Sequence, residues 1–347
     1  MVIQSFSERE KTGVIIISKY LIINADDFGL CHSANEACMD LFESGCLLSS
    51  TIMAPCPGAD EAIEFAKTHP QYAIGVHLTH TNEWMDRFPW GPLTDGKSIR
   101  TPEGRMWPES EDFEAHCSYD DACAETLAQI EYCEKKGMKP SHVDSHMGAL
   151  YGLNGKLKML PKTLAICGKK GYPFRMFSKP LESQCPPGTP MWLFKAACRF
   201  SGIFGKINHV PMPDYLIFPE SIESGESYED FKHNFITYLT DIPDGICETY
   251  IHPALATDEM KAITGRWKRR YWEYAAVRRK ADSEDVSRVR QDQARESVHA
   301  ACRGSRFVRP KARAGTCSLQ RSKPESGCRT DRSALPGAGG IRPGCFH

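Results

Sequence analysis

Apolar runs alternate with helical segments through most of this 347-residue chain. Runs such as residues 20–24 (YLIIN) and 72–79 (YAIGVHLT) lack polar alternation, which is typical of strands buried on both faces. A helix is expected over residues 33–43, with Ser33 as its candidate N-cap and Gly45 at its end. This order predicts βα units and a mainly parallel sheet, and therefore an α/β fold.

The other predicted elements follow the same rhythm. Strands are expected over residues 47–54, 142–144, 172–177 and 245–251, and helices over residues 60–68, 120–136, 156–169 and 231–239. Residues 82–112 and 178–228 break the pattern, because they are rich in aromatic residues and proline and show no clear period. Connections of this length are usually lids or binding loops, so we expect both stretches to be functional loops.

Both ends of the chain differ from its central part. After residue 280 apolar residues become sparse, Gly and Pro recur without a period, and Lys and Arg outnumber Asp and Glu. We therefore expect an extension over residues 1–19, one domain over residues 20–280, and a disordered basic tail over residues 281–347 that resembles a frameshifted or read-through end. The start of the chain lacks the pattern of a signal peptide, which favours a cytoplasmic protein.

Composition limits the classes of function. The 43 Lys and Arg residues balance 44 Asp and Glu residues, and a formal charge of -1 excludes a protein that coats nucleic acid along its whole length. No apolar run reaches the roughly 18 residues of a membrane-spanning helix, so no membrane partner is expected. The 15 cysteines are odd in number and form no C-x-x-C motif, which favours buried thiols in a reducing compartment.

Asp and His residues lie at the ends of four predicted strands. These residues are Asp26 and Asp27, then His77, His146 and His252. Because the carboxyl ends of parallel strands share one rim, these side chains are expected to meet there. Any one of them alone could be a turn residue or a hydrogen-bonded structural group. Four strand ends together predict a metallohydrolase.

Four motifs resemble those of a known family. They are LIINADDFG (residues 21–29), GVHLT (residues 75–79), PSHVDSHMG (residues 140–148) and IHP (residues 251–253). Their order and spacing are similar to those of the YdjC-like carbohydrate deacetylases, also called chitooligosaccharide or chitin disaccharide deacetylases. The resemblance covers roughly residues 18–277. It implies a deformed (β/α) barrel with one divalent metal ion, Mg or Zn, at its rim.

The resemblance also implies a role for each matched residue. Asp27, His77 and His146 match the metal ligands of the family. Asp26 matches an adjacent aspartate that resembles a general base, and His252 matches a late histidine that resembles a general acid. The division of roles between Asp26 and Asp27 stays open.

Further residues are expected to support this site. His142 and Asp144 lie beside the metal motif and are expected to orient the ligands. Arg175 is expected to hold the base or the substrate. Three tryptophans of the first long loop could stack on sugar faces or pack beneath the loop: Trp84, Trp90 and Trp107.

The residue types agree with amide hydrolysis. One carboxylate and two imidazoles leave open positions on a metal ion, while a second carboxylate and a third imidazole can serve as base and acid. We therefore expect a metal-dependent hydrolase that removes N-acetyl groups from small saccharides such as chitooligosaccharides, with a homodimer as the default assembly.

The basic tail could bind nucleic acid. No recognition motif accompanies it, so no nucleic-acid partner is expected.

Two alternatives remain beside this interpretation. The first is a metal-dependent hydrolase of another amide, ester or phosphoester, and the second is a catalytically dead member of the family. Two positions depart from the family pattern: Met147 follows His146 where many members have further histidines, and Ala254 follows the late His-Pro where many have glycine. Beyond Val277 the similarity stops, which could cost stability and leave a dead enzyme because its C-terminal packing is lost.

Overall fold

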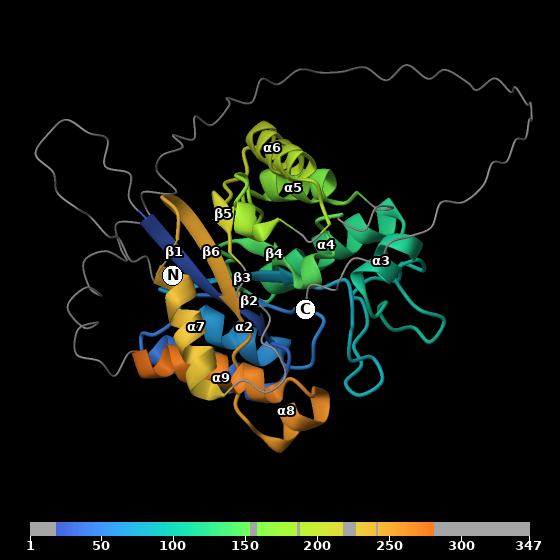
Figure 1. Ribbon diagram of the computed structural model, residues 1–347. Helices are drawn as coiled ribbons and strands as arrows, with labels where there is room; N and C mark the ends of the chain where they lie inside the picture. Colours follow the sequence, from blue (N-terminus) through green and yellow to red (C-terminus); the bar gives the residue numbers. More distant parts are fainter. Residues whose placement is uncertain (1–18, 153–157, 186–187, 218–226, 241, 281–347) are drawn as a thin grey trace, which may run out of the picture.

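The computed structural model describes residues 19–152, 158–185, 188–217, 227–240 and 242–280 (Figure 1). The predicted N-terminal extension up to residue 18 and the predicted basic tail lie outside the described residues. In chain order the elements are β1 (Lys19–Phe28), α1 (His32–Glu43), β2 (Ser49–Ile52), α2 (Ala59–Thr68), β3 (Ala73–Leu78), α3 (Ser110–His116), α4 (Tyr119–Lys135), β4 (Val143–Ser145), η1 (His146–Gly148), α5 (Leu160–Lys170), η2 (Glu182–Gln184), α6 (Met191–Ile207), β5 (Tyr215–Leu216), α7 (Tyr228–Thr240), β6 (Gly245–Ile251), α8 (Asp258–Ile263) and α9 (Trp267–Lys280).

Within the described residues, six parallel strands form one curled sheet with helices around it (Figure 1). The strand order is β4-β3-β2-β1-β6-β5, which places β1 and β2 at the centre. Each ladder is parallel, and β1 pairs with β6 over seven residues from Lys19–Gly245 to Ala25–Ile251. The curl makes a half-barrel whose strand ends face the same rim, so the predicted α/β fold of the deformed barrel type is confirmed.

The core explains why the first strand has no polar alternation. Leu21, Ala25 and Phe28 of β1 are buried, and helix α1 packs Leu41 and Phe42 against the same region. The Phe28 and Phe42 ring centroids lie 6.4 Å apart. Helices on the convex side therefore cover one face of the strands, while the other face is left to polar side chains near the rim.

Two predictions about the region between α5 and β6 were wrong. Residues 178–228 were expected to be a loop, but they contain the 17-residue helix α6 and the short strand β5. Helix α6 is apolar over most of its circumference, and its basic residues form only one narrow stripe (Lys195, Arg199 and Lys206), so it lacks the wide polar face of a typical amphipathic helix. Residues 172–177 were expected to be a strand, but Phe174 makes only a single bridge to Val143, because Pro173 has no N–H to donate to a ladder.

Helix α4 holds the first long loop in place. The Glu125 carboxylate accepts hydrogen bonds from the backbone N–H groups of Leu93 and Thr94, at 3.0 and 2.9 Å. The Gln129 amide exchanges hydrogen bonds with the backbone of Thr79 at the start of the loop. The loop is therefore anchored at both its root and its middle, which fixes the residues that approach the strand ends.

Among the helices that the structure describes, none combines the length and the apolar character needed to cross a membrane. The described cysteines are free thiols, and most of them are buried.

Candidate functional site

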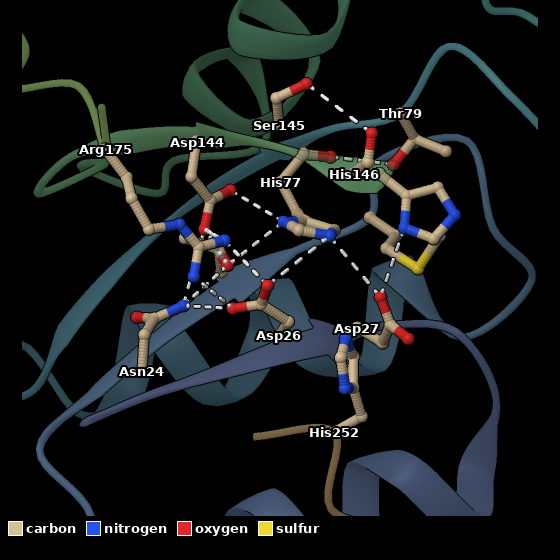
Figure 2. A network of polar contacts seen from close by, with 12 residues as sticks. Asn24, Asp26, Asp27, His77, Thr79, Asp144, Ser145, His146, Arg175 and His252 are labelled. Carbon is tan, nitrogen blue, oxygen red and sulfur yellow. Dashed lines mark hydrogen bonds and ion pairs between the residues drawn. The ribbon is translucent and has the colours of Figure 1, made fainter. Parts of the chain in front are cut away.

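A distortion at the end of β1 sets the directions of the two adjacent aspartates. The β1–β2 pairing shifts register between Ala25 and Phe28, and Asp27 adopts a left-handed backbone conformation with φ of 62°. Strand irregularities of this kind re-aim side chains and are frequent beside active sites. As a result Asp26 faces Arg175, whereas Asp27 faces His77 and His146 (Figure 2). The strand was predicted to end before these residues, but it includes both.

One carboxylate and two imidazoles converge on a single point at this rim. Asp27 Oδ1 lies 3.4 Å from His77 Nε2 and 3.4 Å from His146 Nδ1, and all three residues are buried. Among the described residues, Asp27 Oδ1 has no hydrogen-bond partner, although its atom is shielded from solvent. A buried acceptor without a donor, facing two ring nitrogens, is the donor set that a divalent cation satisfies. These residues could therefore hold a metal ion.

A second grouping, Asp26 with His77 and Asp144, is less suited to a cation. The Arg175 guanidinium already lies between its two carboxylates, with Nη2 at 2.6 Å from Asp26 Oδ2 and 2.5 Å from Asp144 Oδ2. A fixed positive charge at this place satisfies both carboxylates. The Asp27 grouping is thus the better candidate for a metal ion.

The charges around the two rings favour a positive charge at the same point. Burial alone would lower the pKa of His77, but Asp144 and Asp26 raise it to about 10. Burial also opposes a charge on His146, while Glu83 and Asp27 raise its pKa to about 9. Burial would raise the pKa of Asp27, yet Arg270 and the two rings hold it well below its usual value.

Asp144 fixes the orientation of His77. Its Oδ1 atom accepts a hydrogen bond from His77 Nδ1 at 2.6 Å, which leaves His77 Nε2 directed at Asp27. Thr51 donates to the other Asp144 oxygen at 2.7 Å. Burial opposes the charge on Asp144, but Arg175 and His77 lower its pKa to about 2. Asp144 is therefore a charged acceptor that holds the His77 ring in one orientation.

Asp26 is held by three donor atoms. Arg175 binds it through two nitrogen atoms, at 2.8 and 2.6 Å, and Asn24 Nδ2 donates to Oδ1 at 2.8 Å. Asp26 Oδ2 lies 4.0 Å from His77 Nε2, on the side that faces the Asp27 group. Glu248 of β6 extends the network, with Oε1 3.7 Å from Arg175 Nε, and its burial raises its pKa to about 8.

His252 follows β6, and its ring lies beside Asp27 (Figure 2). Its side chain is 29% exposed, unlike the buried rings of His77 and His146. The Glu273 carboxylate of α9 accepts a hydrogen bond from the His252 backbone N–H at 2.6 Å. Burial lowers the pKa of His252, although Asp27 partly opposes this shift.

His142 was expected to orient the ligands, but its contact with this network runs through Asn24. It stands just before β4, and its Nε2 atom is 3.3 Å from the Asn24 Oδ1 atom. Asn24 in turn binds Asp26, so His142 meets the network through Asn24 rather than through a predicted ligand.

Four charged residues of the site were not predicted from the sequence: Glu83, Glu248, Arg270 and Glu273. Arg270 of α9 donates to Asp27 Oδ2 at 2.7 Å, from 243 positions away in the chain. Glu83, in the first long loop, has Oε2 3.0 Å from His146 Nε2. A signal existed for Arg270, since Arg270 and Glu273 lie three residues apart and share the buried face of one helix. Glu83 carried no sequence signal.

The three candidate tryptophans differ in their environments. Trp90 is buried and donates its indole N–H to the backbone carbonyl of Thr81. Trp107 donates to the carbonyl of Ser98 and stacks on His116 with ring centroids 4.0 Å apart. Trp84 lines a surface hollow of about 400 Å³ together with Glu83 and residues 263–266. Only Trp84 of the three lines this hollow.

Fold and site together define a class of protein. A half-barrel of parallel strands gathers a carboxylate and two imidazoles at its rim, and a further carboxylate and imidazole stand beside them. This is the arrangement of an α/β protein whose strand ends could hold a divalent cation.

Comparison with known proteins identifies the family. The family model described as YdjC-like protein matches residues 20–288, and the chain belongs to this family. A carbohydrate deacetylase from Halalkalibacterium halodurans is 28% identical over 274 residues, which cover 78% of this chain and 99% of that protein. A chitooligosaccharide deacetylase from Yersinia enterocolitica is 33% identical over 136 residues, 38% of this chain and 50% of that protein.

A solved structure is similar along most of the chain. A proposed cellobiose-phosphate cleavage protein from Enterococcus faecalis V583 is 25% identical and has a TM-score of 0.59. The match covers 81% of this chain and 94% of that chain. The resemblance to the YdjC-like family that was drawn from the motifs is therefore confirmed.

Proposed function

We propose that this chain is a metal-dependent hydrolase that removes N-acetyl groups from small N-acetylated saccharides such as chitooligosaccharides. Its relatives confirm the predicted enzyme class, because the curated proteins that it matches are carbohydrate deacetylases. The observation that carries the metal dependence is the buried Asp27 Oδ1 atom, which faces His77 Nε2 and His146 Nδ1 without a hydrogen-bond partner among the described residues.

In this proposal Asp27, His77 and His146 hold a divalent cation, with Mg or Zn as the candidates. A cation at this point supplies Lewis-acid chemistry for water and for the amide carbonyl. Asp144 keeps His77 Nε2 directed at the site through the hydrogen bond at Nδ1. Arg270 occupies Asp27 Oδ2, so that Oδ1 remains available.

Asp26 and His252 each carry out one of the two proton transfers of the reaction. Asp26 takes a proton from the water whose oxygen bonds to the carbonyl carbon, and Arg175 and Asn24 hold the carboxylate in place for this step. His252, which lies beside Asp27 (Figure 2), gives a proton to the nitrogen as the C–N bond breaks. The products are acetate and a free amine. The partial exposure of His252 suits contact with a substrate that arrives from solvent.

The hollow beside Glu83 and Trp84 is the proposed place of the sugar. Its volume of about 400 Å³ lies within the usual range of small-molecule sites. Trp84 lines it, and Arg270, which binds Asp27, lies over the indole ring at 5.1 Å, so the hollow lies beside the residues around Asp27. An aromatic wall is suited to the apolar face of a pyranose ring.

Acetate release tests this function. Purified full-length protein is expected to release acetate from diacetylchitobiose or a related N-acetylated sugar when Mg²⁺ or Zn²⁺ is added, and to stop when a chelator is added. Parallel assays with acetyl esters and phosphoesters test whether the protein hydrolyses one of these substrates instead. Folded, metal-loaded protein without activity on any N-acetylated saccharide would contradict the proposal and would favour an alternative substrate or a catalytically dead member.

We further propose that the chain forms a homodimer through α6. The buried side of this helix, which includes Phe194 and Cys198, packs toward the domain. The opposite side exposes five large apolar side chains: Trp192 (71%), Ile207 (65%), Phe200 (47%), Leu193 (46%) and Ile203 (46%). A helix that is apolar on both sides is normally covered. With about 150–250 Å² for an aromatic side chain, the five present on the order of 500 Å², which approaches the ~800 Å² per partner of a stable interface.

Sedimentation velocity tests the dimer. The wild-type protein is expected to sediment as a dimer, and the double variant Trp192→Ser, Ile207→Ser as a monomer. Tyr271→Ser is the control, because Tyr271 is 40% exposed on α9, away from this helix. A monomeric wild type, or a double variant that remains dimeric, would refute the role of α6.

A further inference from the structure

Each of the two rings at the metal site has a carboxylate on its far nitrogen. In His77 the Nδ1 atom binds Asp144 at 2.6 Å, and Nε2 faces Asp27. In His146 the order is reversed, because Nε2 lies 3.0 Å from Glu83 Oε2 and Nδ1 faces Asp27. When the ring is neutral, as it must be to bind a cation, the nitrogen that donates its hydrogen to a carboxylate leaves a lone pair on the other nitrogen. Both lone pairs then point to the same place beside Asp27 Oδ1.

The two carboxylates come from different parts of the fold. Asp144 belongs to β4 and is fully buried within the sheet. Glu83 belongs to the long loop after β3, and its side chain is 16% exposed. Glu83 also lines the surface hollow, so one face of this residue meets the ring and the other lies at the hollow.

His146 needs such a partner more than His77 does. His77 is part of a regular strand, which fixes its backbone through ladder hydrogen bonds. His146 begins the short 3₁₀ turn η1, and the next residue, Met147, has a left-handed φ of 49°. Backbone ladders do not hold this turn, so a side-chain partner must set the orientation of the ring. Among the described residues, Glu83 is the carboxylate that contacts His146 Nε2.

We propose that Glu83 is a positioning residue that holds His146 with Nδ1 directed at Asp27 and so completes the cation site from the wall of the substrate hollow. The proposal deepens the proposed function and rests on it for the identity of the site. Its test measures cation binding itself, so it remains decisive even if the protein hydrolyses another substrate.

The experiment compares three variants of the full chain. Binding of Zn²⁺ and Co²⁺ is measured by competition with a chromophoric chelator, and the Co²⁺ absorption spectrum reports the ligand geometry. Glu83→Ala is expected to weaken the affinity about 10- to 100-fold, the usual effect of losing a partner of a ligating histidine. Glu83→Gln is expected to lose less, because the amide oxygen still accepts a hydrogen bond from His146 Nε2.

Asp86→Asn is the matched control in the same loop. Asp86 is three residues from Glu83, its side chain is 91% exposed, and its Oδ1 atom lies 3.6 Å from Arg105 Nη1. This variant is expected to bind both ions like the wild type. Wild-type affinity and an unchanged Co²⁺ spectrum in Glu83→Ala would overturn the proposal, as would an equal loss in Asp86→Asn. If Glu83→Ala fails to fold, the Co²⁺ absorption spectrum of Glu83→Gln serves as the test instead.

Discussion

Replacing Asp27 with asparagine is expected to lower acetate release about a thousandfold and to weaken metal binding, because a ligand charge worth several kcal/mol in the transition state is lost. Asparagine tolerates the left-handed backbone that Asp27 adopts, with φ of 62°, so the distortion at the end of β1 is expected to persist. The amide can still accept a hydrogen bond from Arg270. The substitution therefore removes the charge while keeping the shape of the site.

Initial rates of acetate release at saturating metal, together with thermal melting, measure this effect. Asp40→Asn is the matched control, since Asp40 pairs with Arg278 on the surface and its side chain is 40% exposed. This control is expected to retain wild-type activity. More than a tenth of the wild-type rate in folded, metal-loaded Asp27→Asn would show that the Asp27 carboxylate is not an essential ligand.

Replacing Arg175 with methionine is expected to lower the free energy of unfolding by about 3–5 kcal/mol, because the variant leaves buried carboxylates without their cation. Arg175 is almost fully buried, and its guanidinium contacts Asp26 and Asp144 and lies near Glu248. Methionine fills much of the same volume, so the loss reflects charge rather than a cavity. Arg175→Lys keeps the charge but cannot bind Asp26 through two nitrogen atoms, and an intermediate loss is expected.

Urea unfolding followed by circular dichroism measures the difference. Arg278→Met is the control, since Arg278 pairs with Asp40 at 2.7 Å but is 34% exposed. A surface pair of this kind contributes about 0–1 kcal/mol. A loss of less than about 1 kcal/mol in Arg175→Met would mean that the carboxylates become protonated or hydrated at little cost.

These two expectations separate the tasks of the neighbouring aspartates. Asp27 faces the two rings and shares its second oxygen with Arg270, whereas Asp26 is bound by Arg175 and Asn24. Loss of Asp27 is thus expected to act mainly on metal binding and rate, and loss of Arg175 mainly on stability. Both aspartates come from the same distorted end of β1.

Much of this protein was predictable from local sequence. Buried strands followed by helical segments predicted the parallel α/β fold, since strand burial and helix period are properties of short segments. The expected N-cap at Ser33 was wrong, because α1 begins at His32 and Cys31 stands at its N-cap. The rim residues Asp26, Asp27, His77, His146 and His252 were predictable because residues at the ends of parallel strands must share one edge. Helix α6 was not predictable in this way, because it is apolar over most of its circumference and has only a narrow polar stripe.

Only the tertiary structure decided how the site is oriented and charged. The motifs place Asp26 beside Asp27, but the register shift in β1 directs them to different partners. Arg270 reaches Asp27 across 243 positions of sequence, and Glu83 reaches His146 from a loop whose course depends on its hydrogen bonds to α4. Such contacts depend on how distant segments pack, so a local pattern carries no information about them. The sequence by itself determined which residue types meet at the rim, and long-range packing decided which atom of each faces the point between Asp27, His77 and His146.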